Sequence, residues 1–318
     1  MESTTHTISV KGQPVAVPSV AIGGARVIAS GRFVRVAVVH DEEWLEPATL
    51  PDPAALLATL RRDRFRADLF SFTQRIPDTK PRYSYRMEWD NAAVIPITTY
   101  QAWWEKLPQV ARRNVRIAAK KGVAVRVVPF DDELIHGIAA VYNEAPIRLG
   151  KRFWHYGKDF ETVKRENGTY LERSEFIGAF YEGKLIGFIK LVYVDRIGSM
   201  MQILSMVQHQ DKRTTNALIA KAVEVCEAKG MSYLKYCQYV YDSNESSLLT
   251  DFKRRNGFER LDFPRYYVPL TRWGCVALAL RAHRGIKGWL PRPVLQAALQ
   301  LRAKYYNLRQ PRGVVAAE

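Results

Sequence analysis

The sequence predicts an α/β protein built on a mixed β-sheet, followed by a basic helical segment. The first observation is a set of short strand-like runs before residue 98, rich in Val, Ile and aromatic residues. The second is the order of patterns over residues 123–270: strand, two helices, three strands, helix, strand, helix and strand. The third is a pair of tight turns, at residues 182–183 and 196–198, which predict that the three central strands form an antiparallel meander.

Residues 1–98 form the first predicted unit. Its strand-like runs are VAVPSVAI, ARVIASGRFVRVAVVH, DLFSFTQRI and PRYSYRMEW. A short helix over residues 51–64 interrupts them, with Pro51 and Pro53 near its start and leucines on one face. The first 13 residues, and those after Gln310, are expected to be poorly structured because they lack these patterns.

A long basic helix opens the second predicted unit, residues 99–270. Pro108 divides this helix, and Gly122 ends it before the alternating strand VAVRVV. Residues 99–126 hold seven Lys or Arg and one acid, Glu105. Two interpretations stay open for this charge, a solvated helix face and a surface for an anionic partner.

The whole chain is strongly basic, with 48 Lys and Arg against 32 Asp and Glu and a net charge of +16. This excess favours anionic partners such as nucleic acid, anionic lipid or phosphorylated substrates. The three cysteines have no metal-ligand spacing and form no complete disulfide set, which favours a reducing compartment. The start MESTTHTISV lacks the pattern of a signal peptide, and no apolar run is long enough to span a bilayer. We therefore expect a cytoplasmic protein.

The stretch RLGKRFWHYGK, residues 148–158, combines cations with aromatic side chains and contains no acid. Cations of this kind pair with phosphate or carboxylate, and aromatic rings stack on a sugar, a nucleobase or an adenine. The stretch predicts a substrate-binding surface; a solvated basic loop with packed aromatic residues is the alternative. The predicted substrate-binding residues are Arg148, Arg152, Trp154, Tyr156 and Lys158.

Residues 271–318 form a third predicted region, a basic helical tail. From residue 264 to residue 312 there are ten Lys or Arg and no acid. The segments WGCVALALRAH and PVLQAALQLRAKYY read as amphipathic helices with nearby aromatic residues, a pattern that suits the surface of an anionic membrane. Two helices packed on the rest of the protein and a tRNA-binding tail are the alternatives. A position on the inner face of the membrane is therefore an additional expectation.

The order of elements in the second unit resembles the Gcn5-related N-acetyltransferase (GNAT) fold, and two motifs resemble its FemAB-type branch more closely. The basic helix matches the spacing R-x-x-x-R-x-A-x-K-x-G-V, and LLTDFKRRNGFE matches an FK-x-x-x-GF ending. The resemblance covers residues 82–270, with residues 14–98 as a degenerate first unit. The matching residues are Arg112, Arg116, Ala118, Lys120, Gly122, Val123, Phe252, Lys253, Gly257 and Phe258.

This resemblance implies two GNAT-like units and a donor site. In the GNAT fold, the helix after the meander starts with a Q/R-x-x-G-x-G/A turn that cradles a pyrophosphate. Here Lys stands in the first position and Thr in place of the key glycine, although the amides of a helix N-terminus bind anions on backbone geometry alone. A role as N-cap of the next helix is the alternative for Asn244. The residues implied to bind the donor are Lys212, Arg213, Thr214, Thr215, Asn216, Ala217 and Asn244.

Transfer of an acyl group to an amine needs the donor carbonyl held near the amine, a route for the proton and a donor to the developing oxyanion. A meander strand that splays from its neighbour supplies backbone amides without any particular side chain. The predicted catalytic side chains are His155, whose pKa is normally near neutrality, and Lys190. In GNAT-like enzymes a tyrosine near the penultimate helix often serves as general acid, and this resemblance implies Tyr239 for that role, with Tyr236 and Tyr241 as nearby alternatives. Each has a structural alternative: a packed loop histidine, a lysine paired with Asp195 or Glu175, and a packing tyrosine.

The sequence therefore predicts an N-acyltransferase that moves an acyl group from acyl-CoA to an amine of a carbohydrate or cell-envelope precursor, either a small molecule or lipid-linked. Aminoacyl transfer from aminoacyl-tRNA is the alternative within the same class. A non-catalytic protein that binds nucleic acid or an anionic membrane on this scaffold is the alternative outside it. No metal is expected, since no H-E-x-x-H or C-x-x-C motif occurs. The oligomeric state stays open.

Overall fold

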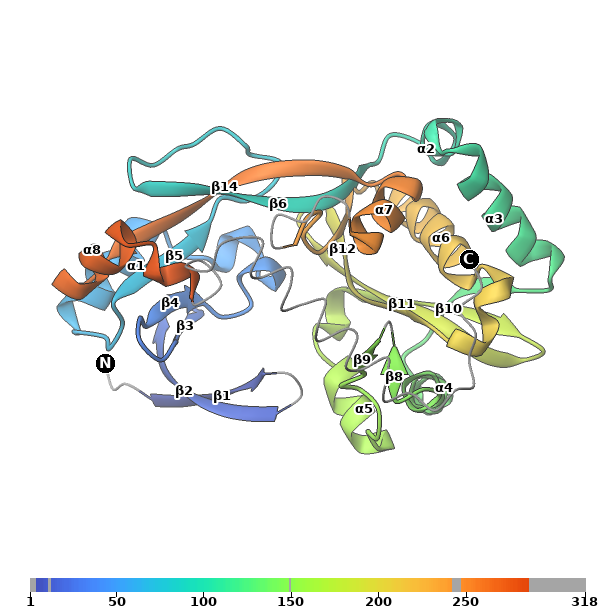
Figure 1. Cartoon of the computed structure of the whole chain (residues 1–318), viewed down its shortest axis with the longest axis horizontal. Helices are drawn as coiled ribbons and strands as arrows, with labels where there is room; N and C mark the ends of the chain where they lie inside the picture. The colour runs from blue at the N-terminus through green and yellow to red at the C-terminus, as the bar shows by residue number, and fades with distance from the viewer. Residues whose placement is uncertain (1–3, 11–12, 149, 242–246, 286–318) are drawn as a thin grey trace.

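The computed structural model describes residues 4–10, 13–148, 150–241 and 247–285. Its main feature is one 12-stranded sheet in the order β1-β2-β3-β4-β5-β14-β6-β13-β12-β11-β10-β7 (Figure 1). A separate ribbon pairs β8 (Ile147–Arg148) with β9 (Lys151–Arg152). The strands of the large sheet are β1 (Thr4–Val10), β2 (Gln13–Ile22), β3 (Ala25–Ser30), β4 (Val36–Val39), β5 (Leu69–Thr73), β6 (Arg86–Pro96), β7 (Ala124–Val128), β10 (Ser174–Tyr181), β11 (Lys184–Val194), β12 (Ile197–Ser205), β13 (Tyr233–Tyr236) and β14 (Glu259–Pro269).

The α-helices lie on both sides of the sheet. In the half that contains β10, β11 and β12, α3 and α6 cover one face and α4 and α5 lie on the other (Figure 1). Three one-turn 3-10 segments, η1 (Glu42–Trp44), η2 (Pro47–Thr49) and η3 (Leu171–Arg173), lie in connecting loops. The α-helices are α1 (Pro53–Arg62), α2 (Tyr100–Lys106), α3 (Gln109–Lys120), α4 (Asp132–Asn143), α5 (Phe160–Asn167), α6 (Thr214–Ala228), α7 (Leu248–Arg255) and α8 (Arg272–Ala279).

The N-terminal unit is an antiparallel set of strands closed by a parallel pair. β2, β3 and β4 are antiparallel neighbours, and α1 then leads to β5, which pairs in parallel with β4. α1 starts at Pro53, where the Asp52 side chain accepts a hydrogen bond from Ala54 N and caps the helix. Its buried leucines join the inner faces of β2 to β5 in one core.

The C-terminal unit repeats this arrangement with larger elements. β10, β11 and β12 form an antiparallel meander, and α6 then leads to β13, which pairs in parallel with β12. Most of α6 is buried between α3 and the sheet, and its apolar side chains belong to the largest core of the protein. The left-handed backbone of Glu182 (φ 50°) and Gly183 (φ 75°) forms the tight turn between β10 and β11.

The two units exchange strands. β6 precedes the C-terminal unit in the sequence and pairs with β13 of that unit. β14 follows the C-terminal unit and pairs over residues 265–269 with β5 of the N-terminal unit. β6 and β14 also pair with each other over nine positions, 259–267 against 94–86, and form the long bridge visible across Figure 1. Each parallel pair is therefore extended by a strand from the other half of the chain.

A second contact between the units comes from the loop with η1 and η2. The hydroxyl of Tyr170, before η3, donates to Asp41, and Asp195 N donates to Glu46 at 3.3 Å. Lys235 on β13 pairs with Glu43 at 2.8 Å. These contacts join the loop to the β11–β12 side of the C-terminal unit, so the exchanged strands are not the only connection among the described residues.

The structure confirms the predicted mixed α/β architecture with a meander, the short first helix and the break at Pro108, which caps α3 after α2 has ended. The expectation that the first 13 residues are poorly structured was wrong for residues 4–10, because β1 pairs with β2 along its whole length. The predicted helix over WGCVALALRAH ends early, at Ala279, before the left-handed Arg281 (φ 57°). PVLQAALQLRAKYY and the residues after Gln310 lie outside the described residues. The divisions at residues 98 and 270 stay predictions.

The exchange of strands predicts that the units unfold together. Leu60→Ala removes a fully buried side chain of α1 and is expected to cost about 2–5 kcal/mol of unfolding free energy. Because β14 belongs to both halves of the sheet, hydrogen exchange should accelerate in β11 and β12 as well as in β2 to β5. Val110→Ala, at a 62% exposed position, is the control and should change neither the unfolding free energy nor the rates of hydrogen exchange. Faster exchange confined to the N-terminal unit would contradict the prediction.

Candidate active site at the free edge of β12

β12 and β13 pair over only a few residues. Residues 197–199 of β12 pair with residues 233–235 of β13, although β12 continues to Ser205. In the described part of the chain, no strand pairs with this side of residues 200–205. We call this part of the strand the free edge of β12.

Alternate backbone amides of β12 point toward this free edge. Met206 N donates to Ile186 O on the β11 side, and the direction of backbone groups alternates along an antiparallel ladder. With the register of β11 and β12, this alternation directs the N–H of Ile203 away from β11. A β-bulge leaves Met201 without an opposite residue just before this point. Since bulges bend a strand and increase its twist, the bulge accounts for the separation of β12 from β13.

The start of α6 lies beside the free edge, but its side chains occupy the turn. The Thr215 hydroxyl is 2.9 Å from the hydroxyl of Ser205 on β12. Thr214 is buried, and its hydroxyl has no partner among the described residues. Lys212 lies 4.2 Å from the ring of Tyr181 and 3.7 Å from Asp211. Thr215 and Lys212 are therefore already engaged by other side chains of the protein.

The remaining predicted donor residues are in three situations. Arg213 has a left-handed backbone (φ 55°) immediately before α6. The Asn216 side chain donates to Asn256 Oδ1 at 2.8 Å and so links α6 to the end of α7, while Ala217 is buried. Asn244 lies outside the described residues. Ser247, and not Asn244, caps α7, because its hydroxyl accepts a hydrogen bond from Thr250 N.

A buried lysine lies at the end of β13. Lys253 on α7 is 0% exposed, and its ammonium donates to the carbonyl oxygen of Gln238, two residues beyond β13. The ammonium lies 5.2 Å from the ring of Tyr236 and 4.5 Å from that of Tyr241. Among the described residues Lys253 pairs with no carboxylate, and burial lowers its pKa to about 8. A lysine with this pKa exchanges its proton readily near neutral pH.

Lys253 was not among the site residues that the sequence predicted. The signal was available in the FK-x-x-x-GF match, which contains Phe252 and Lys253. What the sequence could not show is that the side chain is buried with no carboxylate partner among the described residues. The turn after α7 is fixed by Gly257 (φ 81°), where an added Cβ would lie 2.7 Å from Trp103 Nε1.

Arg148 holds the start of the basic loop to the free edge of β12. Its guanidinium donates to Ser205 O at 2.8 Å and to Val141 O at 2.6 Å. It also pairs with Glu144 at 3.3 Å. Most of the donors of Arg148 are therefore used within the protein, and Nε alone has no partner among the described residues. The contacts assign Arg148 a positioning role, and its predicted binding of substrate stays a prediction.

The other residues of the basic loop divide into a fixed group and an exposed group. Lys158 pairs with Glu166 on α5 at 2.6 Å and lies 4.4 Å from the ring of Trp154. Trp154 is still 51% exposed, and Tyr156 is 48% exposed. Arg152 on β9 is exposed, and no contact occupies its guanidinium in the described residues. Arg152, Trp154 and Tyr156 are thus the members of the predicted set that can meet a ligand without rearrangement.

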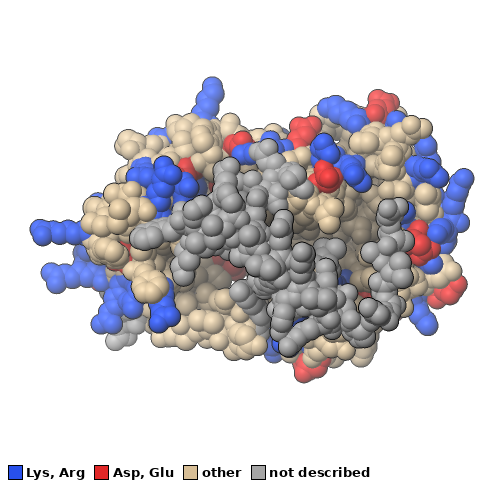
Figure 2. Space-filling model, viewed as in Figure 1, with Lys and Arg blue, Asp and Glu red and all other residues tan. Residues whose placement is uncertain are grey.

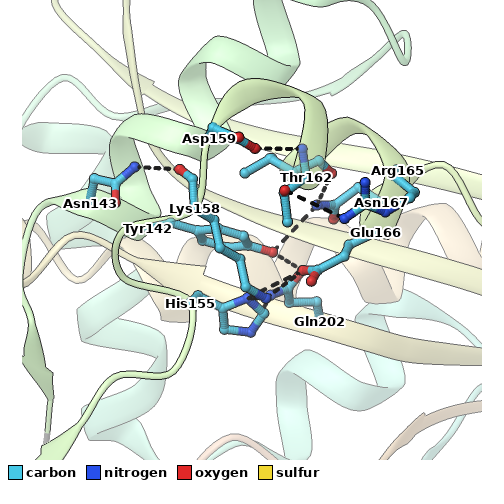
Figure 3. A network of polar contacts seen from close by, with 11 residues as sticks. Tyr142, Asn143, His155, Lys158, Asp159, Thr162, Arg165, Glu166, Asn167 and Gln202 are labelled. Atoms are coloured by element: carbon cyan, nitrogen blue, oxygen red, sulfur yellow. Dashed lines mark hydrogen bonds and ion pairs between the residues drawn. The ribbon is translucent and has the colours of Figure 1, made fainter. Parts of the chain in front are cut away.

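His155 belongs to a packed polar network that joins α4, α5 and β12 (Figure 3). Its Nδ1 is 3.3 Å from the Lys158 ammonium, and its Nε2 is 3.3 Å from the side-chain amide of Gln202. Gln202 also accepts a hydrogen bond from the Tyr142 hydroxyl at 2.8 Å. Burial and the neighbouring cations Lys158 and Arg148 lower the pKa of His155 to about 3. The ring is therefore neutral at physiological pH, and both nitrogens already have neighbours.

The two remaining predicted catalytic residues lie in different surroundings. Lys190 on β11 is 1% exposed and donates to Asn167 O at 2.8 Å and to the Thr169 hydroxyl at 2.9 Å. Burial lowers its pKa to about 8. The alternative that Lys190 pairs with Asp195 or Glu175 is not what the structure shows, since its ammonium binds oxygens of the loop before η3. Tyr239 is half-buried against the C-terminal core, and its carbonyl accepts from Thr250.

A polar pocket lies between the two units. It has a volume of about 310 Å³, and both units line it, with Glu42 and Arg75 from one and Ser199 and Lys235 from the other. Ser199 is the last residue of β12 that pairs with β13, so the pocket adjoins the start of the free edge. The Glu42 carboxylate accepts from Thr73 N at 3.0 Å, and burial raises its pKa.

Comparisons with known proteins identify the fold. FemX has a TM-score of 0.57 and 11% sequence identity to this chain, covering 84% of this chain and 88% of FemX. The C-terminal DUF2156 domain assigned to a lysylphosphatidylglycerol synthetase from Agrobacterium fabrum has a TM-score of 0.53 and 14% identity, covering 86% and 87%. L-PGS from Bacillus licheniformis has a TM-score of 0.53 and 14% identity, covering 82% and 86%. No protein-family model matches the chain, and no curated protein matches it.

The chain therefore shares the fold of FemX and of the other two proteins. This likeness confirms the FemAB-like, GNAT-type fold that the resemblance of the sequence implied. In the described residues, no group of His, Cys, Asp or Glu is suited to hold a metal ion. No helix in the same part of the chain is long and apolar enough to cross a membrane.

The low pKa of His155 predicts a loss of stability in mild acid. The pKa is about 3 in the folded protein and about 6.5 in an unfolded chain. The unfolded chain thus binds a proton as the pH falls below about 6.5, while the folded protein does not. Between pH 7 and pH 5 this difference should remove roughly 2 kcal/mol of unfolding free energy.

His155→Gln removes this titration and keeps a polar side chain beside Lys158 and Gln202. Urea unfolding of both proteins at pH 7 and pH 5 measures the effect, and carboxylates that titrate in both cancel in the comparison. The variant should lose less stability than the wild type over this range. An equal loss in both proteins would mean that His155 is not kept neutral by the fold.

Proposed function

We propose that the protein is a GNAT-type transferase that moves an aminoacyl group from aminoacyl-tRNA to an amine of a carbohydrate or cell-envelope precursor. The observation that carries the proposal is the free edge of β12 together with a buried lysine, Lys253, whose ammonium binds the Gln238 carbonyl just beyond the end of β13, the strand that leaves β12 at this edge. The FemAB-like fold supports a transferase. A lysylphosphatidylglycerol synthetase, by its name, joins an amino acid to a lipid.

The free edge suits a carbonyl that becomes an oxyanion. The acceptor amine attacks the ester carbonyl of the donor, its nitrogen forms the new C–N bond, and the carbonyl oxygen takes the electron pair. The N–H of Ile203, directed away from β11, donates to that oxygen. Because the amide belongs to a strand held by β11 on its other side, it is fixed in place before the reaction starts.

Lys253 serves the second half of the reaction. When the tetrahedral intermediate collapses, the bond to the ribose oxygen of the tRNA breaks and that oxygen needs a proton. A lysine with a pKa of about 8 can supply the proton. The amine proton lost by the acceptor restores the ammonium. The carbonyl of Gln238 and the neighbouring rings hold Lys253 in position for this exchange.

The start of α6 favours an aminoacyl-tRNA donor. Thr215 and Lys212 are engaged by Ser205, Tyr181 and Asp211, so these two side chains are not free to bind a pyrophosphate. The C-terminal end of α3 lies at the same place, because Lys121 pairs with Asp211 at 2.7 Å. A basic helix that leads to the site suits the phosphates of a nucleic acid.

Acyl-CoA, the donor that the sequence favoured, is the second candidate. The buried Ala217 stands where the motif has Gly or Ala, and the N-terminus of α6 attracts anions by its dipole. Binding of CoA requires Thr215 and Lys212 to release their present partners.

The acceptor is proposed to enter from the side of the pocket between the units. Glu42, Arg75 and Lys235 provide polar groups of both signs there. Arg152, Trp154 and Tyr156 on the basic loop remain exposed and suit a phosphate and a ring of a carbohydrate precursor.

Two lysines with the same lowered pKa allow a matched test of the catalytic group. Lys253→Met should lower kcat by about 100-fold or more, because it removes the proton donor, and Lys253→Arg should restore little. Lys190→Met should lower stability and leave kcat within about fivefold, since Lys190 is held by the loop before η3. The measurement is transfer of label from tRNA charged with 14C-labelled amino acids, or from 14C-acetyl-CoA, to amines in a cell extract.

The outcomes distinguish the candidates. Transfer from aminoacyl-tRNA that is lost in Lys253→Met and kept in Lys190→Met supports the proposal. The opposite result would make Lys190 the catalytic lysine. Transfer from acetyl-CoA alone would mean that acyl-CoA, and not aminoacyl-tRNA, is the donor. No transfer with either donor, together with salt-sensitive binding of any polyanion, would support the non-catalytic alternative.

The basic helix provides a separate test of the donor. Arg113→Gln with Lys120→Gln removes two exposed cations of α3. The variant should bind tRNA more weakly, and the slope of log affinity against log salt should fall by about 2. Arg61→Gln with Lys80→Gln, two exposed cations of the N-terminal unit, is the control. An unchanged slope in the α3 variant would place the tRNA elsewhere.

A further inference from the structure

Helix α8 packs against Val34 and Leu69 of the N-terminal unit. It carries exposed apolar side chains that belong neither to a hydrophobic core nor to the candidate site. Trp273 and Val276 lie on α8, and Leu280 caps its C-terminal end, so the three are spaced three and four residues apart. Their side chains are 48%, 45% and 56% exposed, in that order. Phe33, in the loop between β3 and β4, lies beside them and is 72% exposed. We call these four side chains the α8 patch.

Packing fixes the α8 patch in its outward direction. The opposite face of α8 buries Ala277 and Leu278 against Val34 and Leu69. Gly274 lies against the backbone oxygen of Asp68 so closely that an added Cβ would overlap it. The helix therefore cannot rotate to bury the patch.

The tip of the patch is also fixed. The Trp273 indole donates to Phe33 O at 3.1 Å and holds the loop to the helix. A groove of about 800 Å³ runs between the two, lined by Val36, Leu280 and Ala282 among others. Neighbouring apolar side chains that are held exposed in this way suit contact with a partner surface.

Cations surround the patch. Arg32, Arg272 and Arg281 are exposed at its margin, and Arg32 lies 5.6 Å from the Phe33 ring. Figure 2 shows Lys and Arg side chains around the end of the molecule that carries α8.

The acids next to the patch are already engaged. Glu88 is bound by His283 at 3.1 Å and by Arg284 at 3.0 Å. The Asp68 carboxylate accepts from Arg35 N at 2.8 Å and from Thr271 at 3.1 Å. Glu88 is thus paired with a cation, and Arg32, Arg272 and Arg281 outnumber the remaining acid, Asp68, at the margin of the patch.

We propose that the α8 patch docks the protein on the surface of an anionic lipid bilayer. Phe33, Trp273 and Leu280 enter the boundary between headgroups and acyl chains, and the arginines at the margin meet the lipid phosphates. Charge complementarity supports this partner. The chain beyond Gly285 carries six more Lys or Arg and a single acid, Glu318, so it adds charge of the same sign. The proposal does not depend on the transferase reaction.

Flotation of the full chain with vesicles tests the proposal. Vesicles of phosphatidylcholine with 30% phosphatidylglycerol should bind the protein at least tenfold more strongly than phosphatidylcholine alone. Phe33→Ser with Leu280→Ser should weaken binding to the anionic vesicles at least tenfold. Arg32→Glu with Arg272→Glu should do the same. All four side chains are exposed, so thermal unfolding should be unchanged.

Two matched variants on the C-terminal unit are the controls. Val110→Ser with Leu171→Ser removes two exposed apolar residues, and Arg165→Glu with Lys184→Glu makes the same change of net charge. Both controls should bind within about twofold of the wild type. Unchanged binding of the patch variants, or equal losses in patch and control variants, would overturn the proposal. A wild type that elutes as a dimer, with patch variants that elute as monomers, would overturn it in favour of a second copy of the chain.

Discussion

The exchange of β6 and β14 is the constraint on which the rest of the structure depends. A parallel pair formed around a single helix leaves an open sheet edge with unpaired backbone groups. In both units that edge is covered by a strand from the other half of the chain. β6 and β14 then pair with each other, so the edges meet in the middle of one sheet instead of facing solvent. The strand order follows from this single arrangement.

The same constraint shapes the candidate site. β6 pairs with β13 over its four residues, from Tyr233 to Tyr236, which holds β13 to the bridge. β12 is held on its other side by β11 and bends at the bulge after Met200. Strands fixed to different neighbours separate, and the free edge of β12 is the result. The chain after β13 then turns into α7, where Lys253 is buried against the carbonyl of Gln238.

The site residues show how far side-chain chemistry can be predicted from residue type. In the sequence, Arg148, Lys158 and His155 lie close together and predict a binding site, because cations and a histidine suit a phosphorylated substrate. In the structure, Arg148 and Lys158 instead hold Ser205 and Glu166, and together with burial they lower the pKa of His155. Lys190 is a predicted catalytic side chain, and in the structure its ammonium binds the oxygens of Asn167 and Thr169. Local patterns identify such groups but do not reveal which neighbours satisfy them.

The sequence by itself determined the elements and much of their order. Periodicity and turn residues identify the meander, the helix break at Pro108 and the helix that follows β12, and the motif around Arg112 to Val123 indicates the superfamily. These features depend on neighbours within a few turns of the chain. Only the tertiary structure decided that β1 is a strand, that β6 and β14 exchange, and that Lys253 is buried and pairs with no carboxylate in the described part of the chain. Each of these depends on contacts between residues far apart in the sequence, because strand pairing and burial are set by the partner and not by the segment itself.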